Sequence, residues 1–162
     1  MRVAFTTLGC KLNQAEVERW QRDFRAAGHE VTSDLAQADL HVINSCAVTA
    51  AASRDSRKAA GRASRSALPI KTVLAGCYAS SAPEEAARLA GVDLVIPNPL
   101  KEALVARVLE RFPELVHPTR PRHEALSPPP RRGGATTRAF LKVEDGCNLH
   151  CAFCIIPSLR GA

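Results

Sequence analysis

The sequence has few aromatic residues and no long apolar run near its start. Aromatic side chains make up 4% of the 162 residues, with one tryptophan and one tyrosine. Few rings are therefore available for stacking against nucleic-acid bases. The opening residues lack the apolar stretch of a signal peptide, so we expect a cytoplasmic protein with no membrane partner and with reduced thiols rather than disulfides.

Two further absences narrow the chemistry. No acid/base pair or Ser/His/Asp arrangement points to hydrolysis. The motif Cys147-Asn-Leu-His-Cys151-Ala-Phe-Cys154 lacks a fourth cysteine, although a four-iron cluster has four irons to ligate. Three thiolates leave one iron open, and an open iron can bind a substrate or cofactor. Alternatives are zinc, with His150 as the fourth ligand, and simple electron carriage.

The other three cysteines share a position relative to apolar runs. Before each of these cysteines comes a short apolar run rich in β-branched residues, and one small residue separates the run from the cysteine. The three cysteines are Cys10, Cys46 and Cys77. The runs are Val3–Leu8, Leu40–Asn44 and Thr72–Ala75. Such runs predict strands, and the carboxyl ends of parallel strands meet at one edge of a sheet. A buried cysteine is often a mere small hydrophobe, but three at equivalent positions favour a second three-cysteine cluster.

The stretches between these runs predict helices, which makes the fold class α/β, an open parallel sheet with crossover helices. Val17, Trp20, Phe24 and Ala27 form one apolar stripe that ends at Gly28. A helix capped by Asn98, with Pro99 first and Pro113 beyond its end, should bury Leu100, Leu104, Val108 and Phe112. Residues 83–89 predict a short helix and 92–96 a fourth parallel strand, and residues 1–116 suffice for one domain.

Positive charge is concentrated in two stretches. Residues 117–138 hold five of the eleven prolines and five arginines against Glu124, and predict a linker. The helix after Cys46 places four basic residues on one face: Arg54, Lys58, Arg62 and Arg65. This face is a candidate RNA contact, with a merely solvated helix face as the alternative.

Residues 139–162 predict the beginning of a second domain. Ala139–Val143 predicts a strand, and Glu144-Asp-Gly146 turns the chain into the loop of Cys147, Cys151 and Cys154. A strand that delivers a cluster loop is how a catalytic strand–helix barrel would begin. Such a barrel needs roughly 200 residues, so we expect a truncated domain and an inactive fragment.

Both cysteine triplets occur in segments that resemble a known family. Lys142–Pro157 with Arg160-Gly161 is similar to the cluster loop of radical S-adenosylmethionine methylthiotransferases. Three earlier segments resemble those that hold the auxiliary cluster in that family: Thr7–Glu16, Val42–Thr49 and Ala75–Ala79. Gly9-Cys-Lys-Leu-Asn-Gln14 is most similar to the branch that modifies threonylcarbamoyladenosine in tRNA.

The resemblance implies two 4Fe-4S clusters, with Cys147, Cys151 and Cys154 holding the one that binds and reduces S-adenosylmethionine. Cys10, Cys46 and Cys77 would hold the auxiliary cluster that supplies sulfur. The implied reaction adds a methylthio group to carbon 2 of N6-threonylcarbamoyladenosine in the tRNA anticodon loop. The implied electron donor is a flavodoxin or ferredoxin, and we expect a monomer.

Other functions stay open at this point. The substrate is alternatively isopentenyladenosine in tRNA or a ribosomal protein. A non-catalytic iron–sulfur carrier or scaffold, or a metal-free α/β module with structural cysteines, belongs to a different class. Iron and sulfide content separates these classes from one another.

Overall fold

The structure is a computed structural model that describes residues 1–64, 70–116, 140–149 and 151–161. Within these ranges the chain forms a five-stranded, entirely parallel sheet with strand order β2-β1-β3-β4-β5. The strands are β1 (Arg2–Thr7), β2 (Glu30–Thr32), β3 (Leu40–Ser45), β4 (Lys71–Gly76) and β5 (Leu94–Pro97). The predicted α/β fold class is confirmed.

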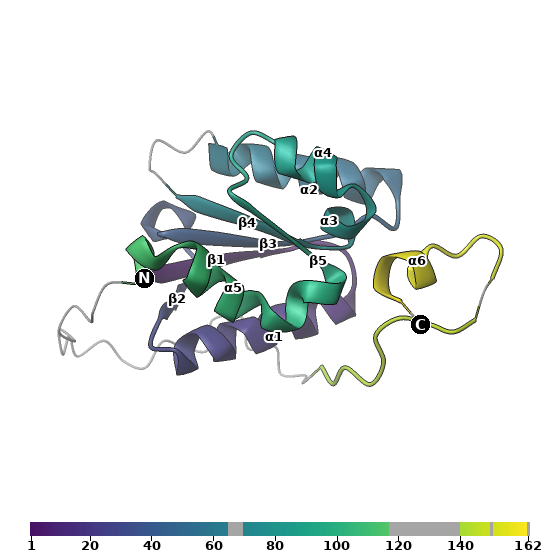
Figure 1. Ribbon diagram of the computed structural model, residues 1–162, viewed down its shortest axis with the longest axis horizontal. Helices are drawn as coiled ribbons and strands as arrows, with labels where there is room; N and C mark the ends of the chain where they lie inside the picture. The colour runs from purple at the N-terminus through teal and green to yellow at the C-terminus, as the bar shows by residue number, and fades with distance from the viewer. Residues whose placement is uncertain (65–69, 117–139, 150, 162) are drawn as a thin grey trace.

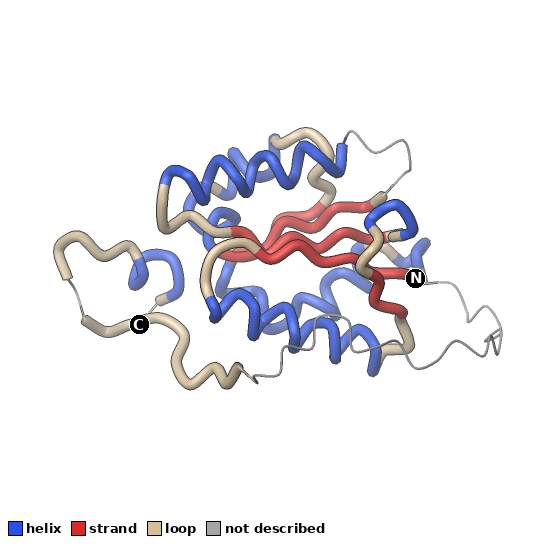
Figure 2. Tube along the Cα trace, turned by 180° about the vertical axis from the view of Figure 1, so that it is seen from behind, coloured by secondary structure: helices blue, strands red, loops and turns tan. Residues whose placement is uncertain are grey.

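Helices cover both faces of the sheet (Figures 1 and 2). One face carries α1 (Lys11–Ala26) and α5 (Leu104–Arg111). The other carries α2 (Ala50–Ser64), α3 (Cys77–Ser81) and α4 (Pro83–Arg88). Short 3-10 helices are η1 (Leu35–Gln37), η2 (Asn98–Ala103) and η3 (Pro113–Leu115). The central strands are consequently apolar on both sides, as is usual for parallel sheets.

Two apolar clusters hold these layers together. Trp20 and Phe24 of α1 pack with Val42 of β3 and Val108 of α5 on one face. On the other face, Ala60 of α2 and Ala86 of α4 pack with Ile43 and Leu74, while Tyr78 of α3 joins them. Because neighbouring residues of a strand point to opposite faces, Val42 and Ile43 serve different clusters. Each cluster fixes its helices over the strand ends.

Most predicted elements are formed, with differences at their ends. Val17, Trp20 and Phe24 of the predicted stripe are buried on α1, whereas Ala27 lies just past the end of the helix and is exposed. Gly28 follows with φ 85°. The helix predicted after Asn98 begins with the 3-10 turn η2, and its Asn98 side chain makes no cap bond. Leu100 is 37% exposed, whereas Leu104, Val108 and Phe112 are buried as predicted. The 3-10 turn rotates Leu100 away from the face of the following helix.

The predicted strand at 139–143 is not formed in the part of it that is described. Residues 140–143 have no regular structure, and Leu141 and Val143 are 85% and 87% exposed. An isolated extended segment has no neighbouring strand to satisfy its backbone, so its apolar composition alone does not make it a strand. The three-residue strand β2 and the short helix α6 (Ile156–Arg160) carry too few residues for a periodic signal.

Three sequence predictions fall outside the described residues. The whole basic, proline-rich linker at 117–138 lies there, as do Arg65 and His150. Among the helices that are described, none combines the length and apolar character of a membrane span.

Candidate functional site

Three cysteines lie at the carboxyl edge of the sheet, at the ends of three adjacent strands. Cys10 stands at the amino end of α1 after β1, Cys46 directly follows β3, and Cys77 is the first residue of α3 after β4. The register pairs Thr7 with Asn44, and Ser45 with Gly76. The three cysteines therefore follow strands that end at nearly the same height of the sheet. This carboxyl edge is where open α/β sheets bind ligands.

The immediate surroundings of these cysteines are closely packed. Cys46 and Cys77 are buried, whereas Cys10 is exposed. Gly9 passes directly beside Cys46, because a Cβ on Gly9 would lie 2.7 Å from the Cys46 Sγ. The Ser56 hydroxyl of α2 accepts from the Cys46 N–H at 3.1 Å and donates to the Cys46 carbonyl at 2.9 Å. Helix α2 thus fixes the backbone at the end of β3.

Cys77 has a polar neighbour from η2. The Asn98 Nδ2 lies 3.7 Å from the Cys77 Sγ and donates a 2.7 Å bond to the Leu159 carbonyl of α6. The Asn98 Oδ1 is buried with no partner among the described residues. Sequence analysis assigned Asn98 to a helix cap, but its side chain instead joins Cys77 to the carboxyl-terminal segment.

The second triplet occupies a loop closed by backbone bonds. The Cys147 N–H donates to the Gly161 carbonyl at 3.0 Å, and the Cys154 N–H donates to the Cys151 carbonyl at 3.1 Å. Gly146 has φ 100°, and a Cβ there would collide with the Gly161 carbonyl oxygen. Cys147 is half-buried, and Cys151 and Cys154 are exposed. The contacts of Gly146 and Cys147 with Gly161 close this loop, and two of its three thiols lie exposed.

The chemistry of the donor set is what iron–sulfur clusters use, because each triplet offers thiols alone. Three thiols lie on three adjacent strand ends, beside a glycine that leaves room next to the Cys46 Sγ. In the described part of the chain, no three His, Cys, Asp or Glu side chains are close enough to hold one metal ion. The ligand role of both triplets stays a prediction.

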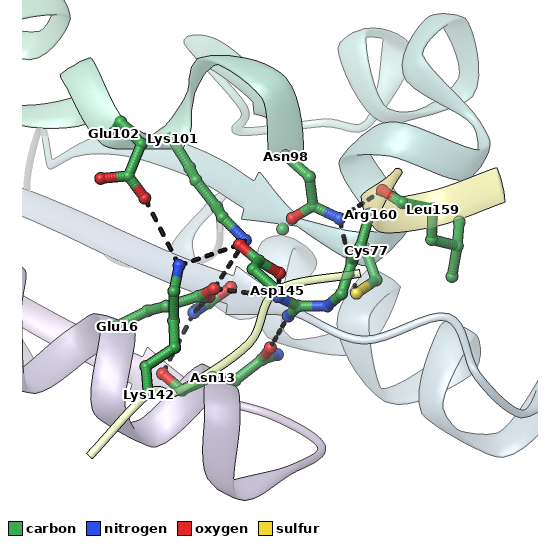
Figure 3. A network of polar contacts seen from close by, with 12 residues as sticks. Asn13, Glu16, Cys77, Asn98, Lys101, Glu102, Lys142, Asp145, Leu159 and Arg160 are labelled. Carbon is green, nitrogen blue, oxygen red and sulfur yellow. Dashed lines mark hydrogen bonds and ion pairs between the residues drawn. The ribbon is translucent and has the colours of Figure 1, made fainter. Parts of the chain in front are cut away.

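A largely buried network of charges joins α1 and η2 to the segment that carries the second triplet (Figure 3). Glu16 of α1 accepts from Lys101 at 2.6 Å and from Arg160 at 2.9 Å. Asp145 accepts from the same two cations, at 2.5 Å from Lys101 and 2.6 Å from Arg160. The four side chains form a ring in which each ion contacts two of opposite sign.

Amides complete the network. Arg160 donates from Nη2 to the Asn13 Oδ1 at 2.6 Å, and Asn44 donates to the Glu16 Oε2 at 3.0 Å. Burial alone would raise the pKa of Glu16, but bonds from Lys101, Asn44 and Arg160 hold that pKa below its usual value. Likewise burial works against the charge of Asp145, yet its bonds to Lys101, Lys142 and Arg160 lower its pKa well below the usual range. Both carboxylates of the ring are therefore ionised.

This network was not predicted from the sequence, although the sequence carries a signal for it. Asn13 and Glu16 share the buried face of α1 with Val17 and Trp20. Lys101 likewise shares a helical face with Leu104. A charged residue on an apolar stripe predicts a buried partner, because isolated buried charges are very costly.

The basic residues of α2 lie on its outer face. Arg54, Lys58 and Arg62 are exposed, and Lys58 pairs with Asp55 at 3.9 Å. Within the described ranges Arg54 and Arg62 make no ion pair. Arg57 lies nearer the sheet, 3.6 Å from Glu85 and 5.7 Å above the Tyr78 ring. The outward face is therefore largely unneutralised.

Known proteins with similar sequences are methylthiotransferases. Threonylcarbamoyladenosine tRNA methylthiotransferase MtaB of Aquifex aeolicus is 40% identical over 99% of this chain and 40% of its own length. MtaB of Bacillus subtilis is 36% identical over 98% of the chain and 36% of its own length. Ribosomal protein uS12 methylthiotransferase RimO of Chloroflexus aurantiacus is 31% identical over 99% of the chain and 40% of its own length.

The chain thus spans about two fifths of the length of these relatives. A family model described as uncharacterized protein family UPF0004 matches residues 2–97, which contain the whole described sheet and Cys10, Cys46 and Cys77. The chain therefore belongs to the family UPF0004, the amino-terminal domain of the methylthiotransferases.

Proposed function

We propose that this chain is part of a tRNA methylthiotransferase. The enzyme would add a methylthio group to carbon 2 of N6-threonylcarbamoyladenosine beside the anticodon. The observation that carries the proposal is that the sheet edge with one cysteine triplet contacts the segment that carries the other. Cys10, Cys46 and Cys77 end adjacent strands there. The loop of Cys147, Cys151 and Cys154 is joined to the same edge through Asn98 and Arg160. The likeness to MtaB over the whole chain supports the substrate.

Each triplet would hold one 4Fe-4S cluster with one iron open to a ligand. When bound, the clusters would supply the one-electron reduction of S-adenosylmethionine and the sulfur to be inserted. An external flavodoxin or ferredoxin would supply the electron. The protein's own residues hold the thiols in place and exclude water.

We assign separate parts of this task to different residues. Gly9 leaves space beside the Cys46 thiol that any side chain would fill. Ser56 fixes the Cys46 backbone from α2. Asn98 contacts the Cys77 sulfur while binding α6. Cys46 and Cys77 are 5% and 2% exposed, which keeps bulk water from two of the three auxiliary ligands.

Metal analysis tests the cofactor part of the proposal. After anaerobic reconstitution, two clusters predict about eight irons and eight sulfides per chain. The triple variant Cys10→Ala/Cys46→Ala/Cys77→Ala should keep about four, and so should Cys147→Ala/Cys151→Ala/Cys154→Ala. The two variants control each other, because each leaves the other triplet intact. Stoichiometric zinc, or no metal in the parent chain, would contradict the proposal.

Nucleoside analysis tests the substrate. Total tRNA from cells with the intact gene should contain 2-methylthio-N6-threonylcarbamoyladenosine, and tRNA from cells with the gene disrupted should not. Replacing Cys77 by alanine should abolish the product without lowering the level of the unmethylthiolated nucleoside. The likeness to RimO makes ribosomal protein uS12 the second candidate substrate. A mass shift of uS12 with unchanged tRNA would favour that candidate.

A further inference from the structure

The segment that carries Cys147, Cys151 and Cys154 contacts the sheet domain through charges rather than through a broad apolar face. Arg160 reaches Glu16, which is 144 residues earlier in the chain, and Asp145 reaches Lys101. The Leu159 carbonyl accepts from Asn98. By contrast Leu149 and Phe153 of the loop are 70% and 95% exposed. Polar contacts therefore fix where the loop lies.

The four ions of the ring divide equally between the two parts. Glu16 and Lys101 belong to α1 and η2, whereas Asp145 and Arg160 belong to the loop segment (Figure 3). The side chains of Glu16, Lys101 and Arg160 are only 2–3% exposed. Within the ring each half pairs internally, and the contacts of Glu16 with Arg160 and of Lys101 with Asp145 form only when the halves meet. Lys142 gives Asp145 a further partner from its own segment, at 2.9 Å. Such a ring selects one docked position, because a shifted loop would leave each buried ion with fewer partners.

The docked loop also covers one cysteine of the first triplet. Cys77 is 2% exposed, and its neighbours include Asn98, Leu159 and Arg160 (Figure 3). Leu159 is 4% exposed, and α6 packs against α3, the helix that Cys77 begins. Cys46 is covered differently, by Gly9 and by the Ser56 contact from α2. The covers of the two buried thiols are therefore separable.

We propose that the ring of Glu16, Lys101, Asp145 and Arg160 is a positioning device that docks the 145–161 loop over Cys77 and so sets the two cysteine triplets against each other. Its consequence for catalysis rests on the function proposed above, but the docking itself does not. In the intact enzyme the ring would fix the separation between the site that reduces S-adenosylmethionine and the site that supplies sulfur.

Thiol accessibility tests the docking without metal or substrate. The full 162-residue chain, reduced and metal-free, is treated with iodoacetamide, and alkylation of each cysteine is followed by mass spectrometry. In the parent chain Cys10, Cys151 and Cys154 should react fast, and Cys46 and Cys77 slowly. Arg160→Ala and Asp145→Ala should speed alkylation of Cys77 by at least about tenfold, since a broken buried ion pair raises the open population. Cys46 should keep its parent rate.

The controls separate docking from general stability. Glu84→Gln removes an exposed carboxylate that pairs with Arg88 at 3.5 Å within α4, away from the ring, and it should leave the Cys77 rate unchanged. Glu16→Gln alters the ring from the sheet side and should reproduce the Cys77 effect, although it changes no loop residue. An unchanged Cys77 rate in both Asp145→Ala and Arg160→Ala would overturn the proposal. An equal rise at Cys46 would also overturn it, because the ring would then stabilise the whole fold. Loss of iron in the reconstitution experiment would contradict the proposed function and leave this result standing.

Discussion

At the scale of single residues, two glycines share a left-handed backbone but differ in their surroundings. Gly28 ends α1 with φ 85° and has open space where a Cβ would be. Gly76 precedes Cys77 with φ 95°, and a Cβ there would meet the Asn44 Oδ1 and, at 2.7 Å, the Ser45 carbonyl oxygen. Both positions strain an L-residue. Only Gly76 adds a collision with the neighbouring strand.

We therefore expect Gly76→Ala to cost at least about 2 kcal/mol more in free energy of unfolding than Gly28→Ala. The matched pair removes the common backbone strain from the comparison. Urea unfolding followed by circular dichroism gives both values. Equal losses in the two variants would show that the packing around Gly76 yields to a methyl group.

His41 is the residue that should make stability depend on mild acid. It is buried in β3, where its Nε2 lies 2.8 Å from the Thr6 Oγ1 and its Nδ1 has no partner among the described residues. Burial lowers the pKa of His41 to about 4. Between these two values the His41 imidazole is therefore protonated in the unfolded chain, where its pKa is the ordinary 6.5, but neutral in the folded state.

Stability should accordingly fall as the pH drops from about 6.5 to about 4, by about 3 kcal/mol in total from this group, and fall no further from it below that range. Urea unfolding at pH 7.0, 6.0 and 5.0 measures the slope. His41→Gln should flatten it, whatever its effect on stability at pH 7. His29→Gln is the control and should keep most of the slope, because His29 is only partly buried and its lowered pKa arises from modest burial and the nearby amino terminus. A parent chain equally stable at pH 7 and 5 would contradict this account.

At the scale of elements, the contact between α2 and the end of β3 depends on one hydroxyl. Ser56 is fully buried and bonds both backbone groups of Cys46. Ser56→Ala would leave that buried N–H and carbonyl without their partner, at a cost of about 2 kcal/mol. Because the released residue is Cys46, we also expect faster alkylation of this thiol with no change at Cys77.

Ser53→Ala is the matched control, since Ser53 lies on the same helix, is half-buried and makes no side-chain hydrogen bond within the described ranges. Thermal unfolding and the alkylation rates of both variants give the comparison. If Ser53→Ala and Ser56→Ala lowered stability equally, the anchoring of α2 would be due to its apolar residues alone.

The elements also show which sequence signals can be relied upon. Apolar runs ending in cysteine predicted β1, β3 and β4 because a buried parallel strand needs that composition. Residues 140–143 have a similar composition without forming a strand, since strand formation also needs a neighbour. Asn98 has the residue type of a helix cap but binds the Leu159 carbonyl, 61 residues away. Local patterns predict elements well, and long-range polar partners override them.

At the scale of the whole molecule, the charge ring had the weakest sequence signal. Its members come from three separate parts of the chain, and periodicity marks Glu16 and Lys101 only as charged residues on apolar faces. The sequence next to Asp145 and Arg160 does not predict which residues they pair with. The strand-end cysteines were accessible to sequence reasoning because parallel topology alone brings them to one edge. Docking of the loop depends on tertiary contacts that no such rule supplies.

The last prediction concerns the charge distribution over the molecule. Arg54 and Arg62 lie on the outer face of α2, which begins shortly after Cys46 at the cysteine edge, whereas Arg22 and Arg25 lie exposed on α1 across the sheet. If tRNA contacts the α2 face, the double variant Arg54→Gln/Arg62→Gln should weaken tRNA binding about tenfold. The negative slope of log affinity against log salt concentration should become shallower by about 1.5. The double variant Arg22→Gln/Arg25→Gln removes the same net charge and should change little. Fluorescence anisotropy with labelled tRNA at several salt concentrations measures both. Equal weakening by the two variants would mean that the chain attracts RNA through its net charge alone, and that α2 has no special role.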